Sequence, residues 1–342
     1  MNMRKMDDIT LAVVGATGAV GREVIRILEG RELFPKKIRF TASPKSVGQT
    51  IQFKGKSVVI EEINESFFDD VDVAICSAGS MVSQKWITPE FLKNTIAIDN
   101  CSFHRMDPKV PLIVPEVNIH ALAKRPQKGV IANPNCTTIA MTVPLGAIHQ
   151  EFPIQKIVSS SYQSVSGAGQ NGINELSEQV QQEAQFKEIK PKVFPRKIAY
   201  NLIPNIGGIL PNLYTVEEQK MIHETQKIFN DPSIQVAPTC IRVPTFVGHG
   251  LSLYVETKAP ITVTEIRKIL SEAPGVTLMD GNKDTYPVLS DCQGRDETCV
   301  GRIRPGMSEN SFQLWAVSDN LRKGAALNAV QILESVLTQS WF

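Results

Sequence analysis

The sequence has no long apolar run and no excess of either charge. No stretch of about 18 apolar residues occurs, which argues against a transmembrane helix. Lys and Arg total 36, Asp and Glu total 35, and the formal net charge is +1. This balance provides no basic surface for nucleic acid or for an anionic membrane. Residues 1–8 contain a basic pair but no apolar segment behind it, so we expect no secretory signal and a cytoplasmic protein.

The six cysteines are few and widely spaced, and none forms a C-x-x-C pair. Their separations predict neither a zinc site nor a dense disulfide framework, so we expect no metal and free thiols. The default interpretation of each one is a small buried apolar residue. Cys292 and Cys299 lie seven residues apart in a polar stretch, and the sequence assigns them no role.

A length of 342 residues favours two domains over one core. In the first part, short continuously apolar strands alternate with helical segments, which is typical of a doubly wound parallel sheet of the Rossmann type. The strands expected there are 9–14, 38–41, 71–76, 95–99, 112–114 and 130–132, with a helix over 20–28. We therefore predict an α/β nucleotide-binding domain formed by residues 1–135 and about 319–342.

The second part has longer strands and predicts an α+β domain with a mostly antiparallel sheet, residues 136–318. Pro144 should kink or interrupt the first of its helices, and 191–211 is rich in Pro and Gly and should be extended. The expected strands are 154–163, 234–243, 250–257 and 312–317. The expected helices are 137–150, 171–185, 216–230, 262–272 and, closing on the first domain, 321–337.

A glycine-rich segment, Gly15-Ala16-Thr17-Gly18-Ala19-Val20-Gly21, follows an apolar strand and opens a helix. Glycines permit a tight turn and close backbone approach, and the helix N-terminus offers N–H groups to a pyrophosphate. The segment therefore predicts a dinucleotide site. The contacts expected are those of Gly15, Thr17, Gly18, Ala19 and Val20.

The end of the second strand bears on the choice of cofactor. NAD enzymes usually place an acidic residue there for the ribose 2′-hydroxyl. This strand instead leads into Ser43, Lys45 and Ser46, which suit a 2′-phosphate and favour NADP. The alternative is that Lys45 is an ordinary solvated loop lysine.

Cys136 lies in the segment Asn133-Pro134-Asn135-Cys136-Thr137-Thr138, between a short strand and a helical run. A thiol at a helix N-terminus has a lowered pKa and a larger thiolate fraction, which suits a nucleophile. Taken alone, the segment would favour a buried structural cysteine at a turn.

Four segments together make the sequence similar to a known family. They are GATGAVG (15–21), NPNCTT (133–138), SYQSVSGAG (161–169) and RVPTFVGH (242–249), in this order. With them the chain resembles the aspartate-semialdehyde dehydrogenases over nearly its whole length. The resemblance implies reductive dephosphorylation of L-aspartyl-4-phosphate by NADPH through a thioester on Cys136. It also implies a homodimer formed through the second domain, and a product used for lysine, threonine and methionine biosynthesis.

The resemblance also implies roles for individual residues. His249 would be the acid/base group, since an imidazole titrates near neutral pH. Arg242 would hold the substrate carboxylate by a two-pronged hydrogen bond. Gln163 would orient the substrate, and Glu217 would face its ammonium group.

Five further positions carry implied binding roles. Lys220 and Arg105 would bind inorganic phosphate or the phosphoryl group, and Ser166, Gly167 and Asn320 would contact the cofactor. Plainer interpretations exist for some of them. Glu217 and Lys220 are three apart and could form a solvated helix ion pair, and Asp319 or Asn320 could simply cap a helix.

Two other functions remain open from the sequence. One is a different acyl-phosphate or acyl-CoA reductase, against which the pair Arg242 and Glu217 argues, because an amino acid needs one cation and one anion. The other is a nucleotide-binding redox sensor with Cys136 as its switch. A sensor needs neither paired phosphate ligands nor a histidine near the thiol.

Overall fold

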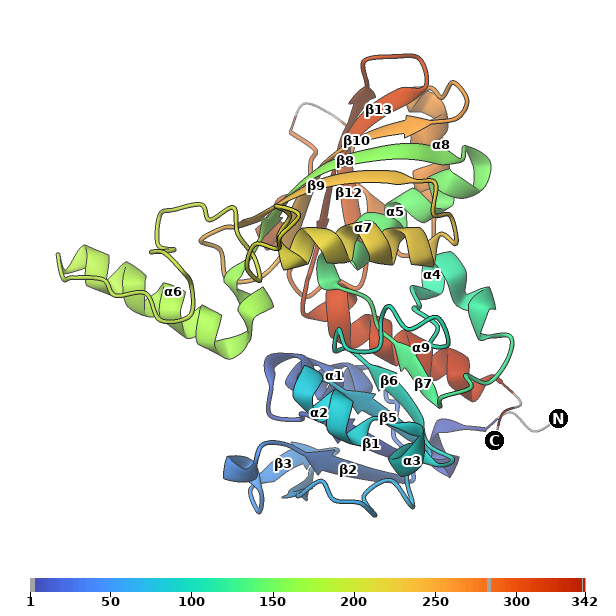
Figure 1. Ribbon diagram of the computed structural model, residues 1–342, viewed down its shortest axis with the longest axis vertical. Helices are drawn as coiled ribbons and strands as arrows, with labels where there is room; N and C mark the ends of the chain where they lie inside the picture. Colours follow the sequence, from blue (N-terminus) through green and yellow to red (C-terminus); the bar gives the residue numbers. More distant parts are fainter. Residues whose placement is uncertain (1–3, 282–283, 340, 342) are drawn as a thin grey trace. The chain divides into compact units, whose positions relative to one another are not determined.

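The computed structural model describes residues 4–281, 284–339 and 341, which form two compact units (Figure 1). The first unit contains Met1–Asn135 and Ala325–Phe342, and the second contains Cys136–Gly324. Residues 1–3, which begin the stretch considered for a secretory signal, lie outside the described residues. In the described residues, no helix is both long and apolar enough to cross a membrane.

The first unit is built on a seven-stranded sheet with the order β3-β4-β2-β1-β5-β6-β7. All its pairings are parallel except that of β3 with β4, which confirms the predicted doubly wound arrangement. The strands are β1 (Thr10–Val14), β2 (Lys37–Thr41), β3 (Thr50–Phe53), β4 (Lys56–Glu61), β5 (Val73–Cys76), β6 (Ile96–Asp99) and β7 (Val130–Ala132).

The helices of this unit precede and follow the second unit in the chain. They are α1 (Ala19–Gly30), α2 (Ser80–Trp86), α3 (Pro89–Leu92), α4 (Pro115–Asn118) and α9 (Leu327–Leu337), with 3₁₀ turns η1 (Met6–Asp8), η2 (Pro44–Ser46) and η3 (Ile119–Leu122). A π-helical turn, η6 (Arg322–Ala326), leads into α9. The predicted helix 321–337 is therefore regular α-helix only from Leu327.

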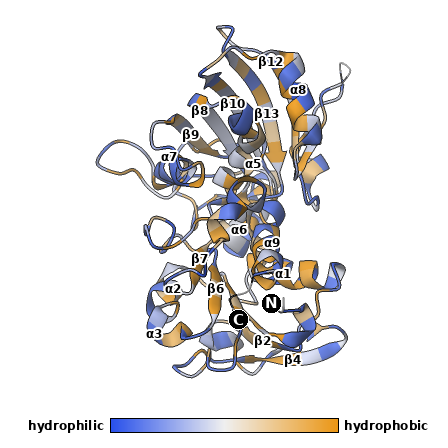
Figure 2. Cartoon of the chain, turned by 90° about the vertical axis from the view of Figure 1, so that its right-hand side faces the viewer, coloured by the Kyte–Doolittle hydropathy of each residue, from blue (hydrophilic) through white to orange (hydrophobic). Residues whose placement is uncertain are grey.

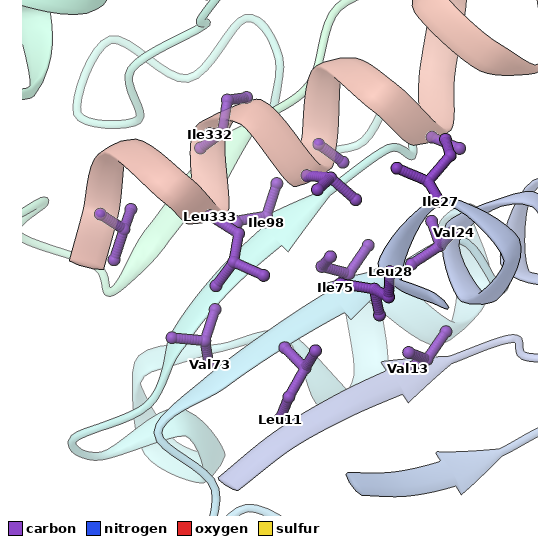
Figure 3. Close-up of a cluster of buried hydrophobic side chains, with 14 of the residues drawn as sticks. Leu11, Val13, Val24, Ile27, Leu28, Val73, Ile75, Ile98, Ile332 and Leu333 are labelled. Carbon is purple, nitrogen blue, oxygen red and sulfur yellow. The ribbon is translucent and has the colours of Figure 1, made fainter. Parts of the chain in front are cut away.

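The core of the first unit lies between the sheet and helices α1 and α9 (Figure 3). Leu11 and Val13 of β1 are fully buried, as are Leu28 of α1 and Leu333 of α9. Strands β6 and β7 are almost wholly apolar (Figure 2), as expected for strands of a parallel sheet covered on both faces. α9 thus completes a core whose other residues lie mostly within 9–131, about two hundred or more positions earlier in the chain.

Two expectations for this unit were wrong. Residues 112–114 form only a single bridge, Leu112 with Ala132, because Pro111 and Pro115 leave too few residues for a strand and Pro115 begins α4. The hairpin β3–β4 was not predicted because its strands are largely polar and exposed. Its turn, Lys54-Gly55, has positive φ at both residues and is the sequence signal that could have revealed it.

The second unit is built on a six-stranded sheet with the order β11-β12-β13-β10-β8-β9. β8 pairs with β9 and β11 with β12 in parallel, and the other pairings are antiparallel, which confirms a mostly antiparallel sheet. The strands are β8 (Ile154–Gln163), β9 (Gln235–Arg242), β10 (His249–Thr257), β11 (Val276–Leu278), β12 (Thr298–Pro305) and β13 (Ser311–Ser318). β11 and β12 were not predicted.

One face of this sheet is covered by helices. α5, α7 and α8 pack on strands β8 to β13, and alternate residues such as Leu251, Leu253 and Val255 of β10 are buried beneath them. On the opposite face, Val158 is exposed and Tyr254 is partly exposed. The helices of the unit are α5 (Cys136–Glu151), α6 (Gly169–Ala184), α7 (Val216–Ile228) and α8 (Val263–Glu272), with short turns η4 (Val165–Ala168) and η5 (Leu289–Cys292).

Helix α5 runs unbroken past Pro144, contrary to the expected interruption. Nearly all of its residues from Thr137 to Ile148 are buried, so tertiary packing outweighs the hydrogen bond that a proline removes. Helix α6, by contrast, projects away from the sheet of its unit (Figure 1). Its apolar side meets Phe194 and Ile198 of the following irregular segment in a small separate cluster.

Candidate active site

The glycine-rich turn of the first unit is shaped for close backbone approach. Gly15 has φ +92°, and a Cβ there would lie 2.9 Å from the carbonyl carbon of Ser77. A Cβ on Gly21 would lie 2.2 Å from the Gly15 oxygen, so α1 can pack against the turn only without a side chain at Gly21. α1 begins at Ala19 with Gly18 as its N-cap, which leaves the first N–H groups of the helix for a ligand.

A cavity of about 540 Å³ opens over this turn at the carboxyl ends of the parallel strands. Four of the predicted cofactor residues line it: Gly15, Thr17, Gly18 and Ser43. Ala19 and Val20 lie beside them in the first turn of α1, and Lys45 and Ser46 lie in η2 between the lining residues Pro44 and Val47. This cradle fits the dinucleotide that the sequence predicts.

The cavity also has walls that sequence reasoning missed. Glu62 follows β4, and Val82, Lys85 and Trp86 belong to α2. The Lys85 ammonium lies 4.5 Å from the centre of the Trp86 ring. Nothing local in the sequence marks these residues, because they reach the cavity only through the strand order of the sheet. One acidic residue, Glu62, therefore lines the cavity, although none stands at the end of β2.

In the second unit, three predicted residues lie side by side at the ends of three neighbouring strands. Gln163, the last residue of β8, pairs with Arg242, the last of β9, and with His249, the first of β10. Successive side chains of a strand point to opposite faces of the sheet. The side chains of these three residues point to the face that the helices cover. All three are almost fully buried, with exposures of 1%, 6% and 0%.

Cys136 is the first residue of α5, the helix that packs on this same face of the sheet. It is partly exposed, whereas the other five cysteines are buried. A thiolate at Cys136 would stabilise the guanidinium of Arg242 and would oppose ionisation of Cys240 of β9. A Cβ on Gly324 would lie 2.9 Å from the Cys136 Cβ, so the nucleophile candidate has backbone directly beside it.

His249 has one bonded and one unbonded ring nitrogen. Nδ1 accepts from the backbone N–H of Ser164 at 3.2 Å and lies 3.3 Å from the Ser164 hydroxyl. Nε2 is buried and has no partner among the described residues. Burial, with the charge of Arg242 as a second cause, lowers the pKa of His249 to about 3. The expected titration near neutral pH is therefore absent here, and the ring is neutral with its proton on Nε2.

Arg242 is held in place by one hydrogen bond, from Nη1 to the Ser164 carbonyl at 2.7 Å. Burial lowers its pKa, while the nearby charge of Glu217 raises it. Within the described ranges no carboxylate lies at ion-pair distance from it, so a buried guanidinium is available for an anionic ligand.

Glu217 and Lys220 do form an ion pair, at 3.1 Å, as the plainer interpretation proposed. The pair is not solvated at its acidic end, since the Glu217 side chain is 7% exposed. A capping box at Thr215 and Glu218 fixes the start of α7, and Glu218 also accepts from the Cys240 N–H. Glu217 is therefore held under the sheet, where its charge acts on both Arg242 and His249.

Asn320 joins three segments of the second unit. Its Oδ1 accepts from the Gly248 N–H at 2.9 Å and from the hydroxyls of Ser164 and Ser166 at 3.1 and 3.2 Å. The helix cap belongs instead to Asp319, which accepts from the N–H groups of Leu321 and Arg322. The Asn320 side chain thus positions the Ser/Gly loop and the residue before His249.

Of two other predicted residues, Gly167 lies against this group and Arg105 belongs to the other unit. Gly167 is exposed, and a Cβ there would lie 2.6 Å from the Arg242 Nη1, so the loop passes directly over the guanidinium. Arg105 belongs to the first unit, where its Nη2 donates to the Asn100 carbonyl at 2.6 Å. The phosphate site that Arg105 and Lys220 would form stays a prediction. No three His, Cys, Asp or Glu side chains gather as metal ligands in the described part of the chain.

Known proteins resemble the chain throughout its length. Residues 10–125 match the family model described as semialdehyde dehydrogenase, NAD binding domain, and residues 145–323 match semialdehyde dehydrogenase, dimerisation domain. Aspartate-semialdehyde dehydrogenase of Bacillus subtilis is 44% identical over 337 residues, covering 95% of this chain and 96% of the relative. That of Aquifex aeolicus is 43% identical over 334 residues, covering 96% and 98%. A crystal structure of aspartate semialdehyde dehydrogenase II from Vibrio cholerae, complexed with ASA, is 42% identical and has a TM-score of 0.94, covering 97% of this chain and 99% of that one.

Proposed function

Because this chain belongs to the aspartate-semialdehyde dehydrogenase family, we propose that it reduces L-aspartyl-4-phosphate with NADPH to L-aspartate 4-semialdehyde and phosphate. Its product would feed lysine, threonine and methionine biosynthesis. The observation that carries the proposal is the alignment of Arg242, Gln163 and His249 on three strand ends, on the sheet face where α5 begins with Cys136.

We assign the covalent step to Cys136. Its thiolate attacks the acyl carbon, the carbon–oxygen bond to phosphate breaks, and phosphate leaves with the bonding electrons, which produces a thioester. NADPH, when bound, supplies the hydride that reduces this thioester. The tetrahedral anion then collapses, the carbon–sulfur bond breaks, and the thiolate of Cys136 is restored as the aldehyde forms. The helix N-terminus at Cys136 stabilises the thiolate at the start and the end of this sequence.

His249 serves this reaction as a neutral hydrogen-bond donor. With Nδ1 engaged by Ser164, the proton of the neutral ring is on Nε2, which has no protein partner among the described residues. A buried N–H directed at the substrate oxygen stabilises the negative charge that develops on it. This favours electrostatic stabilisation over removal of the thiol proton, for which Nε2 would have to be unprotonated.

The remaining site residues fit an amino acid substrate. Arg242 is a buried cation with no carboxylate at ion-pair distance among the described residues, and it would bind the α-carboxylate. Glu217, buried nearby, would face the ammonium group, and Gln163 between Arg242 and His249 would orient the acyl group. A generic acyl-phosphate or acyl-CoA reductase has no need of this opposite pair of charges, which is why we favour aspartyl phosphate.

The first unit would hold the cofactor, and we propose NADP. The cavity over Gly15 and Gly18 would accept a pyrophosphate. Lys85 lines the cavity and Lys45 lies beside it, and either cation would suit a 2′-phosphate. The second unit would bind the substrate and form a homodimer, as the dimerisation domain model suggests. Phosphate would bind to Lys220 and Arg105. A cytoplasmic location agrees with six free thiols.

The deciding experiment is an assay in the reverse direction. L-Aspartate semialdehyde, NADP and phosphate are supplied, and reduced cofactor is measured for the wild type and for Cys136→Ala. We expect activity that requires phosphate and is lost in the variant. A folded wild-type protein that binds NADP but does not oxidise this aldehyde would refute the proposed substrate. Activity retained in Cys136→Ala would refute the proposed nucleophile.

A further inference from the structure

The chain passes between the two units twice, after Asn135 and after Gly324. Near these crossings the first unit contains a chain of three amide side chains, those of Asn100, Asn133 and Asn328. Asn133 Nδ2 donates to Asn100 Oδ1 at 2.7 Å, and Asn133 Oδ1 accepts from Asn328 Nδ2 at 2.7 Å. The middle amide also lies 3.4 Å from the carbonyl of Ala325, the first residue after the second crossing.

Asn133 and Asn328 are fully buried. An amide at such a place is costly unless it is bonded, and here both the donor and the acceptor group of Asn133 are used. The backbone of Asn133 is already fixed by its own N–H, which donates to the Asp99 carbonyl at 2.8 Å. The side chain is thus not needed to extend the sheet. What it adds is a link between the segment leaving the first unit and the segment returning to it.

The same two segments are also adjacent inside the second unit. A Cβ on Gly324, the last residue before the return, would lie 2.9 Å from the Cys136 Cβ. Cys136 is both the first residue after the outward crossing and the first residue of α5. Only two residues separate Asn133 from Cys136, and one is Pro134, whose ring restricts the backbone. The position of the Asn133 amide is therefore transmitted to the nucleophile over a very short and stiff connection.

We propose that Asn133 is a positioning residue for Cys136. Through its bonds to Asn100 and Asn328 it sets the place at which the chain enters α5, and so the place of the thiol. The Asn100 carbonyl also accepts from Arg105 Nη2 at 2.6 Å, so the same network holds a candidate phosphate ligand. The proposal rests on the proposed role of Cys136 as the nucleophile.

The test compares Asn133→Ala with Asn118→Ala. Asn118 is also a buried amide of the first unit with both groups bonded, to Leu112 O at 2.8 Å and Val114 N at 2.9 Å, and among the described residues it makes no hydrogen bond to Asn100, Asn133 or Asn328. Both variants should lose thermal stability. Only Asn133→Ala should lower kcat, by about 10- to 100-fold, because a small displacement of a reacting group is costly. The KM for NADP should change less than threefold in both.

A second measurement needs no turnover. Cys136 is the cysteine that is not buried, so the rate of its alkylation by iodoacetamide can be followed against pH, with Cys136→Ser as the blank. Asn133→Ala should shift this profile or slow the reaction at least threefold, and Asn118→Ala should not. Equal kcat and equal alkylation in the two variants would overturn the proposal. If the wild type itself were inactive with aspartate semialdehyde, the proposed function would fail, while the alkylation profiles would still decide whether Asn133 positions the thiol.

If Asn133→Ala does not fold, Asn100→Ala tests the same amide network. Asn100 is only half-buried, and the substitution removes the acceptor for Asn133 but leaves the backbone carbonyl that holds Arg105. We expect a loss of kcat and a changed alkylation profile in the same direction. Wild-type values for both in a folded Asn100→Ala protein would contradict the role assigned to the network.

Discussion

The charge state of His249 is set by its surroundings. The ring is fully buried, Arg242 lies nearby, and Nδ1 receives the Ser164 N–H. Each of these opposes a positive charge on the imidazole, and the last one also determines the tautomer. A histidine in such a place is a fixed donor at Nε2, which is useful where negative charge develops on a substrate oxygen.

A pH dependence of stability follows from this. The ordinary pKa of histidine, near 6.5, applies to the unfolded chain, and that of folded His249 is about 3. Between these values the unfolded state binds a proton that the folded state does not, so stability falls as pH drops from about 6.5 towards 3. The contribution reaches the order of 5 kcal/mol at the acid end. Denaturant unfolding at several pH values should show a flatter profile for His249→Asn than for the wild type.

The matched control is His223→Asn. His223 is exposed, and its one bond among the described residues is to Gln219 on its own helix, so its removal should leave the slope of stability against pH unchanged. Parallel curves for His249→Asn and the wild type over this range would show that folded His249 is not held neutral.

A methyl group at Gly324 should impair the nucleophile. The Cβ of Gly324→Ala would come within 2.9 Å of the Cys136 Cβ, which has no freedom to move without moving the start of α5. We expect kcat to fall roughly 10- to 100-fold, with NADP affinity retained. Steady-state kinetics with NADP titration measures both. Unchanged kcat in this variant would mean that the site tolerates displacement of Cys136.

Among the individual residues, sequence reasoning could find Cys136, Gln163, Arg242 and His249 because each stands in a segment of recognisable composition and order. It could not find Glu62, Lys85 or Asn133. The first two reach the cofactor cavity through strand order, and Asn133 acquires its partners Asn100 and Asn328 only when distant segments meet. Nor could it foresee the pKa of His249, which burial determines.

At the scale of elements, the site depends on two local arrangements. One is the set of strand ends at β8, β9 and β10, whose terminal residues pair with one another across the sheet. The other is the docking of α1 on β1, where Gly21 faces the Gly15 carbonyl. Both are rigid places from which a turn or a short loop presents functional groups.

The docking of α1 on β1 can be tested directly. Gly21→Ala places a Cβ 2.2 Å from the Gly15 oxygen, so α1 must shift away from the turn. We expect a loss of about 1–3 kcal/mol in stability and an NADP dissociation constant raised about tenfold or more. Gly30→Ala in the same helix meets no atom within 4 Å and should change neither. Fluorescence titration and thermal unfolding report the two effects. Equal NADP affinity in both variants would show that α1 docking does not shape the site.

Element prediction succeeded where local pattern and burial agree. The apolar strands of the first unit and the long strands β8, β9 and β10 are found close to their predicted bounds. Element prediction failed where the local pattern and the burial of a segment conflict. Polar, exposed β3 and β4 lack the expected hydrophobicity, two prolines cut short 112–114, and the buried α5 tolerates Pro144. Tertiary packing decides these cases.

At the scale of the whole molecule, the uncovered face of the second sheet is the candidate surface for self-association. Helices α5, α7 and α8 of that unit pack on the other face. On the uncovered face Val158 is 41% exposed beside Tyr254, its partner on β10. A sheet face that helices α5, α7 and α8 leave uncovered, in a unit that matches a dimerisation domain, suits an isologous contact with a second copy.

Val158→Arg should therefore weaken the proposed homodimer. A buried, unpaired charge on each side of a two-fold contact is strongly unfavourable. Sedimentation velocity over a concentration series should show a shift towards monomer. Val59→Arg is the control, because Val59 is 53% exposed on a strand of the first unit. A dimer that persists equally in both variants would place the interface elsewhere.

The interruption of the first unit by the second has a consequence for how the protein is made. The second unit is one continuous stretch, Cys136–Gly324, whereas the first needs α9, which the ribosome adds only afterwards. Leu327, Val330 and Leu333 cover strands synthesised some two hundred residues earlier. During translation the nascent second unit can therefore complete its core first. The nucleotide-binding unit, although its sheet emerges earlier, must wait with an uncovered apolar face until α9 leaves the exit tunnel.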